Sequence, residues 1–284
     1  MSRTIFVTVS DDRHGRKGGK YEKTQSHIHT FLKENKSFGV TDHLAITFKD
    51  YSQSSEFKNN FESQSDIRPH VNGRAYKPYA IREALRKIND DDFLIYNDCS
   101  PEIWGDVANG TYKKISSIFK LEVLKEMCVC NRDILTPYNI AGEKGFVDPK
   151  YNEHTHRFYT LSKCIKTMGF EEYENCFQHA SGLIVLRKCD KSVTFVDNWL
   201  RWNLVPECAS LDPAWAVEAE AYGGYKKGHR HDQSISGLLV NQLGLNLVNT
   251  YDVAHRMTTF RNWCFLSLCI RDHQYRFVNS NLYK

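Results

Sequence analysis

Short apolar runs alternate with amphipathic segments along much of the chain. β-Branched and aliphatic residues predict a strand at 4–9 and a second at 43–48, with a helix at about 23–35 between them. Later runs predict strands at 93–96, 183–188 and 245–251, and helices at about 80–88, 160–168 and 193–202. Strands that alternate with helices in this way favour an α/β protein with a mostly parallel central sheet flanked by helices.

The segment 74–102 carries the most informative pattern. Apolar residues recur at helical spacing with Arg and Lys opposite them, which predicts an amphipathic helix; they are Ala80, Ile81, Ala84, Leu85 and Ile88. The apolar run at 93–96 then predicts a strand buried on both faces, and Asp98 lies just past its carboxyl end. Ligands of open α/β sheets bind at that end of the strands, so Asp98 is a candidate binding residue. A turn or helix cap before Pro101 is the other interpretation.

Composition narrows the class of protein only slightly. The 284 residues, 41% of them hydrophobic and 13% aromatic, fit one large globular domain. The formal net charge is +4 without a block of five or six basic residues, so nucleic acid is not an expected partner. No run of eighteen apolar residues and no signal-peptide pattern occur, which predicts a soluble protein without a transmembrane segment. Nine scattered cysteines, an odd number, favour free thiols in a reducing compartment.

Two basic residues stand near the start of the helix predicted around 80–88. A cation at a helix N-terminus opposes the helix dipole unless an anion lies nearby. A bound diphosphate would supply that anion for Lys77 and, by the same logic, for Arg74. A lysine that folds back into solvent is the alternative.

Two later segments place small or polar residues before apolar elements. Ser181 and Gly182 precede the strand predicted at 183–188, where a glycine lets a ligand approach the main chain closely. An ordinary turn that leads into the strand explains them equally. The polar segment 228–236 opens an apolar helix, and Asp232 within it is either a helix cap or a carboxylate placed to act as a base.

The order of these segments resembles a known family. Three segments are similar to the core of GT-A-type glycosyltransferases, of the small soluble kind found in bacterial surface-glycan clusters and large DNA viruses of algae. They are the helix start Lys77-Pro78-Tyr79, the strand that ends at Asp98, and the later segment His231-Asp232-Gln233-Ser234. The resemblance covers roughly 4–256 and implies one GT-A-like, Rossmann-like domain over 1–284. A nucleotide-binding half would span about 1–125, a sugar and acceptor half about 126–257, and a C-terminal tail 258–284.

The resemblance also implies an activity. A sugar would move from a nucleotide-diphosphate donor, with a UDP-sugar favoured, to a hydroxyl of a glycan or glycoprotein acceptor, with inversion of configuration and assistance from Mn²⁺ or Mg²⁺. The location would be cytoplasmic, and the host cytoplasm if the protein is viral. Asp232 would be the catalytic base, and Asp98 with His255 would bind the metal. The remaining implied contacts are nucleotide and phosphate binding by Thr8, Ser10, Arg13, Arg74, Lys77 and Asp98, and sugar binding by Ser181, Gly182 and His231.

One departure from the family concerns the metal. The family's metal motif has acidic residues at both ends of a triplet, whereas Asp98-Cys99-Ser100 has one. The metal requirement is therefore open. Ser100 could bind the metal through its hydroxyl, or Glu102 could reach it. Alternatively, Lys77, Arg74 and Arg256 could offset the charge of the leaving group without a metal.

Two other classes of protein remain open. A sugar-nucleotide nucleotidyltransferase would share the sheet and the metal site, but would begin with a glycine-rich loop followed by a lysine, which residues 16–20 match only loosely. A non-catalytic glycan-binding module would need aromatic platforms and no nucleotide site.

Overall fold

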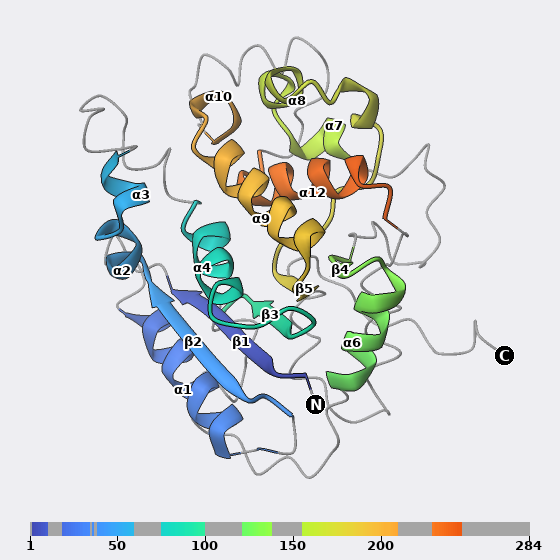
Figure 1. Cartoon of the computed structure of the whole chain (residues 1–284). Coiled ribbons are helices and arrows are strands. Elements are labelled where there is room, and N and C mark those ends of the chain that lie inside the picture. Colours follow the sequence, from blue (N-terminus) through green and yellow to red (C-terminus); the bar gives the residue numbers. More distant parts are fainter. Residues whose placement is uncertain are drawn as a thin grey trace, which may run out of the picture.

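The computed structural model describes residues 2–10, 19–34, 36, 39–59, 75–99, 121–137, 155–209 and 229–245. Within them an open five-stranded sheet lies between helices (Figure 1). Its strands, in the spatial order β2-β1-β3-β5-β4, are β1 (Thr4–Ser10), β2 (Asp42–Thr47), β3 (Phe93–Asn97), β4 (Ile134–Leu135) and β5 (Leu183–Arg187).

The direction of β5 distinguishes it from the other described strands. β1 pairs in parallel with both β2 and β3, whereas β5 is antiparallel to β3 and to β4. Four of the five described strands therefore point the same way. The prediction of an α/β protein with a mostly parallel sheet flanked by helices is confirmed.

Helices cover both faces of the sheet and bury most of the side chains of its central strands. On one face α1 (Lys20–Glu34) packs against β1 and β2 through Ile28, Phe31 and Leu32, and α6 (Leu121–Cys130) packs against β4 and β5. On the other face α4 (Tyr76–Leu85), α9 (Asp190–Asn203) and α12 (Asp232–Gln242) form a continuous core with the sheet. The fully buried Trp199 of α9 belongs to that core.

Shorter elements complete the described part of the chain. They are α2 (Phe48–Ser52), α3 (Ser55–Phe57), α7 (His156–Tyr159), α8 (Ser162–Met168), the 3₁₀ helix η4 (Glu171–Tyr173) and α10 (Pro206–Ala209). The four helices predicted at 23–35, 80–88, 160–168 and 193–202 are present with their ends shifted by a few residues, and α12 is the helix predicted to begin in the polar segment 228–236. The strand predicted at 245–251 lies outside the described residues, apart from its first position.

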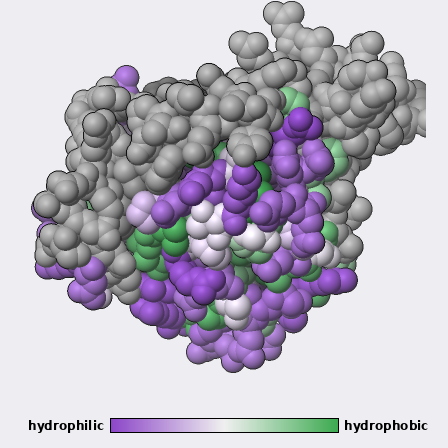
Figure 2. Space-filling model, turned by 90° about the horizontal axis from the view of Figure 1, so that it is seen from above, coloured by the Kyte–Doolittle hydropathy of each residue, from purple (hydrophilic) through white to green (hydrophobic). Residues whose placement is uncertain are grey.

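The described surface is largely polar. Figure 2 shows hydrophilic residues over most of the coloured part of one face. Among the described residues, Val129 alone is a large hydrophobic side chain with high exposure, at 45%. The described segments contain no helix long and apolar enough to cross a membrane. The seven cysteines at described positions form no disulfide bond.

The contact between α12 and α7 leaves no room for a side chain at Gly237. A Cβ built there would lie 2.7 Å from Cε1 of His156 and 3.2 Å from the backbone nitrogen of His179. His156 cannot easily move, because its ring nitrogens lie 3.1 Å from Oγ1 of Thr160 and 3.0 Å from Nδ2 of Asn241.

We expect Gly237→Ala to lower the free energy of unfolding by about 1–3 kcal/mol, the usual cost of an overpacked core. In an open helix the same change would be stabilising by about 1 kcal/mol, so the sign of the effect reports the clash. Thermal unfolding of the variant measures it. Ser236→Ala at the neighbouring helical position serves as a control, with an expected loss of about 1 kcal/mol for the bond from Ser236 to the Gln233 carbonyl. A higher melting temperature for Gly237→Ala would contradict the prediction.

Candidate functional site

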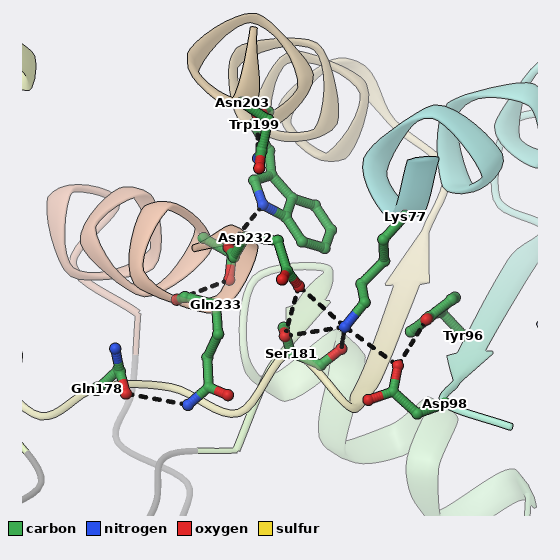
Figure 3. Close-up of polar contacts among 10 residues, drawn as sticks. Lys77, Tyr96, Asp98, Gln178, Ser181, Trp199, Asn203, Asp232 and Gln233 are labelled. Carbon is green, nitrogen blue, oxygen red and sulfur yellow. Dashed lines mark hydrogen bonds and ion pairs between the residues drawn. The ribbon is translucent and has the colours of Figure 1, made fainter. Parts of the chain in front are cut away.

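Residues from four segments meet at the carboxyl end of β3. Asn97, the last residue of β3, pairs with Leu183, the first residue of β5, because β5 runs in the opposite direction. The residues that follow β3 therefore lie beside those that precede β5, and the Asp98 amide donates to the Gly182 carbonyl at 3.0 Å. The first turns of α4 and α12 approach the same point, with Lys77 and Asp232 respectively (Figure 3).

The ammonium group of Lys77 lies at the centre of this cluster. Its Nζ is 2.9 Å from Oδ2 of Asp232 and 3.1 Å from Oδ1 of Asp98. It also donates toward Ser181, with 3.1 Å to Oγ and 3.3 Å to the carbonyl oxygen. The Ser181 hydroxyl in turn donates to Oδ2 of Asp232 at 3.0 Å. One cation thus joins two carboxylates and a hydroxyl that lie far apart in the sequence.

Burial makes the charges of the cluster strongly dependent on one another. The Lys77 side chain is 8% exposed, that of Asp232 is 4% exposed, and that of Asp98 is 35% exposed. Burial lowers the pKa of Lys77, but the charges of Asp232 and Asp98 outweigh it and raise the pKa above its ordinary value. Lys77 is therefore protonated at neutral pH. With both aspartates ionised, the three side chains carry a formal excess of one negative charge.

Tyr96 holds Asp98 from within the sheet. Its hydroxyl donates to Oδ1 of Asp98 at 2.6 Å, and the Lys77 ammonium lies 5.4 Å from the centre of its ring. Burial, followed by the charge of Asp98, raises the pKa of Tyr96 well above its ordinary value, so the phenol stays neutral and keeps its proton for this bond. Asp98 is thus fixed by Lys77 and Tyr96 while a third of its side chain faces solvent.

The start of α12 holds Asp232 in place. The indole nitrogen of Trp199 donates to the Asp232 backbone carbonyl at 2.8 Å. His231, just before it, has φ +48°, a left-handed backbone conformation that residues other than glycine seldom adopt. The His231 ring contacts that of His229. Both ring nitrogens of His229 are engaged by the main chain, at Leu161 and Cys208, so His229 has a structural role.

Gly182 allows the close approach of β3 and β5 at this point. A Cβ at position 182 would lie 3.2 Å from Oδ2 of Asp98, tighter than most real contacts of a Cβ. The sequence-based argument that a glycine here provides space is consistent with this geometry, although the group that approaches in the structure is the protein's own carboxylate.

The residues predicted to bind nucleotide are distributed differently. Thr8 and Ser10 project toward α1, where their hydroxyls lie 2.7 Å from Nε2 of His29 and 3.2 Å from Oε1 of Gln25. Lys77 and Asp98 lie toward α4, on the other side of the sheet. Their predicted contacts with nucleotide stay predictions. The remaining predicted site residues, Arg13, Arg74 and His255, lie outside the described residues, as do Ser100, Glu102 and Arg256.

The metal site predicted at Asp98 and His255 stays a prediction, because His255 lies outside the described residues. A divalent ion held between Asp98 and Asp232 would compete with Lys77, because one oxygen of each carboxylate already contacts Nζ, and Oδ1 of Asp98 also accepts the Tyr96 hydroxyl. Among the residues that the structure describes, no group of three or more His, Cys, Asp or Glu side chains is arranged to hold a metal ion.

Sequence reasoning missed two residues that support the cluster. Tyr96 precedes Asp98 by two positions in an extended segment, so both side chains point to the same side, and that spacing was a usable signal. Trp199 belongs to an apolar stripe of α9, and nothing local marks its indole nitrogen as the partner of a carbonyl in α12.

Fold and site define an α/β protein with a buried lysine–carboxylate cluster at one edge of its sheet. The sequence matches no protein-family model and no curated protein. Function therefore has to be argued from the cluster itself.

Proposed function

We propose that this protein is a glycosyltransferase that moves a sugar from a nucleotide-diphosphate donor, with a UDP-sugar favoured, to a hydroxyl of a glycan or glycoprotein. One observation carries the proposal. The segments that resemble GT-A-type glycosyltransferases contribute Lys77, Asp98, Ser181 and Asp232 to one hydrogen-bonded cluster. Lys77 and Ser181 are 104 positions apart, so the meeting of these segments is independent of the sequence pattern that singled them out.

The position of the cluster supports a ligand-binding role. It lies just beyond the carboxyl end of β3, where open α/β sheets bind their ligands. The positive φ of His231 places a strained residue beside the cluster, and strain of about 1–3 kcal/mol is common at active sites, although Asp91, Arg132 and Asp133 share a positive φ away from it. Buried charges at one point of the fold are a further feature that active sites share.

The chemistry of the proposed transfer requires a carboxylate near the sugar. An acceptor oxygen attacks the anomeric carbon, the bond from that carbon to the diphosphate oxygen breaks, and the acceptor proton passes to a base. Ionised carboxylates also accept hydrogen bonds from sugar hydroxyls. Both tasks suit the exposed side of the Lys77 cluster.

Exposure distinguishes the two carboxylates. Asp98 is 35% exposed, whereas Asp232 is 4% exposed and its Oδ2 accepts from both Lys77 and Ser181. We therefore assign substrate contact to Asp98. Asp232 then acts through Lys77 and Ser181 as a positioning residue. The role of Asp232 as the base, and inversion at the sugar, stay predictions from the sequence.

Calorimetric titration with UDP, GDP and CMP, each in EDTA and in Mn²⁺, tests the proposal. We expect UDP to bind with one site per chain, and a UDP-sugar to be slowly hydrolysed in the absence of acceptor. Binding of GDP or CMP without binding of UDP would mean that the donor carries guanosine or cytidine in place of uridine. Failure of all three nucleotides to bind would overturn the proposal.

A further inference from the structure

We infer that the ammonium group of Lys77 occupies the position that a divalent cation would take if it joined Asp98 and Asp232, so that the site operates without a metal bridging these two carboxylates. The inference rests on the proposed function as far as it concerns a nucleotide-sugar donor. Its statement about the cation rests on the cluster alone.

The surroundings of Nζ are those of a bound cation. Four oxygens lie within 3.3 Å of it, one from each carboxylate and two from Ser181. A metal ion needs bonds of about 2.0–2.6 Å to its oxygens, so an ion that joined Oδ1 of Asp98 to Oδ2 of Asp232 would occupy the space of Nζ. Figure 3 shows the lysine reaching this point from α4 while Asp98 and Asp232 approach from two sides.

Lys77 cannot easily leave its position or lose its charge. Its side chain is 8% exposed, and moving the ammonium away would break its 2.9 Å ion pair with the almost fully buried Asp232. Release of the proton is opposed by the two carboxylates that hold it. A divalent ion that entered beside the lysine would have to share the two carboxylates with a fixed positive charge at close range.

This arrangement determines which part of a donor the cluster can contact. The excess of one negative charge would repel a diphosphate placed against Asp98. Hydroxyl groups, which are uncharged donors, suit an exposed carboxylate of this kind. We therefore place the sugar or ribose hydroxyls of the donor at Asp98, and the diphosphate at basic groups elsewhere in the chain.

Binding of Mn²⁺ alone, measured from the electron paramagnetic resonance signal of the free ion, tests the inference. Lys77→Met opens the position between the carboxylates, and Lys125→Met is a matched control, because Lys125 forms an ion pair with the highly exposed Glu122. We expect folded Lys77→Met to bind Mn²⁺ at least about tenfold more tightly than the wild type and the control. A folded Lys77→Met that binds Mn²⁺ no more tightly than the wild type would overturn the inference.

A second measurement uses the unaltered protein, so it does not depend on how well Lys77→Met folds. We expect UDP to bind with the same affinity, within about threefold, in EDTA and in Mn²⁺. A gain of about tenfold or more in Mn²⁺ would overturn the inference. If UDP binds in neither condition, the proposed function fails, while the comparison of Mn²⁺ binding by the wild type and by Lys77→Met still decides whether Lys77 occupies the cation position.

Discussion

Replacement of Lys77 by methionine is expected to lower the free energy of unfolding by about 3–5 kcal/mol, the usual cost of removing one partner from a buried ion pair. The cost arises at Asp232, whose side chain is 4% exposed and would lose the ammonium group that lies 2.9 Å from its Oδ2. Methionine retains most of the aliphatic part of the lysine side chain, so the loss of stability arises mainly from the missing charge and less from altered packing. Urea unfolding followed by tryptophan fluorescence gives the value.

Two comparisons separate the charge effect from a general effect of losing a lysine. Lys125→Met, which breaks a pair with an 81% exposed glutamate, is expected to cost no more than about 1 kcal/mol. The double variant Lys77→Met with Asp232→Asn removes both charges of the buried pair, so its loss should be smaller than the sum of the two single losses. Strict additivity would mean that Lys77 and Asp232 are not coupled.

The segment around Asp98 could be predicted because its signals are local. Helical spacing identified α4, and the apolar run at 93–96 identified β3 within one residue of its observed end. A residue just past a parallel strand must lie at the ligand-binding edge of such a sheet, so the position of Asp98 followed from the sequence.

The meeting of Asp98 with Ser181 and Gly182 could not be derived in the same way. An apolar run such as Leu183 to Arg187 looks the same in either direction, and only the reversed direction of β5 brings its first residues to the end of β3. The family resemblance pointed to Ser181 and Gly182 as site residues, but it did not predict the reversed direction of β5. β4, with two residues, is too short to leave a periodic signal at all.

The two carboxylates that contact Lys77 could not be predicted from the sequence of its helix alone. A lysine at a helix N-terminus indicated a nearby anion, and the sequence offered diphosphate or solvent as the explanation. In the structure the anions are Asp232 and Asp98, contributed by two other segments. Local electrostatics predicted the need for negative charge correctly, but the choice between a ligand and the protein's own carboxylates depends on tertiary contacts.

Asp98→Asn is expected to reduce turnover of the donor by about 10- to 100-fold, because hydrogen bonds from the sugar hydroxyls to a charged group contribute about 1.5–3 kcal/mol. The amide keeps the shape of the side chain and loses the charge that we place against the sugar. Stability should fall by only about 1 kcal/mol, because a third of the Asp98 side chain is solvated. Steady-state kinetics with a UDP-sugar and urea unfolding of the same sample measure the two effects.

Asp232→Asn is expected to show the opposite balance, with the larger loss in stability and the smaller loss in turnover, because its carboxylate is buried and acts through Lys77. Asp133→Asn is the control for both, since Asp133 pairs with Arg187 at the far end of β5 and should leave turnover unchanged. If folded Asp232→Asn binds the donor normally and loses turnover, while Asp98→Asn remains active, then Asp232 is the base that the sequence pattern predicted. Exposure would then have been the wrong criterion for choosing between the two carboxylates.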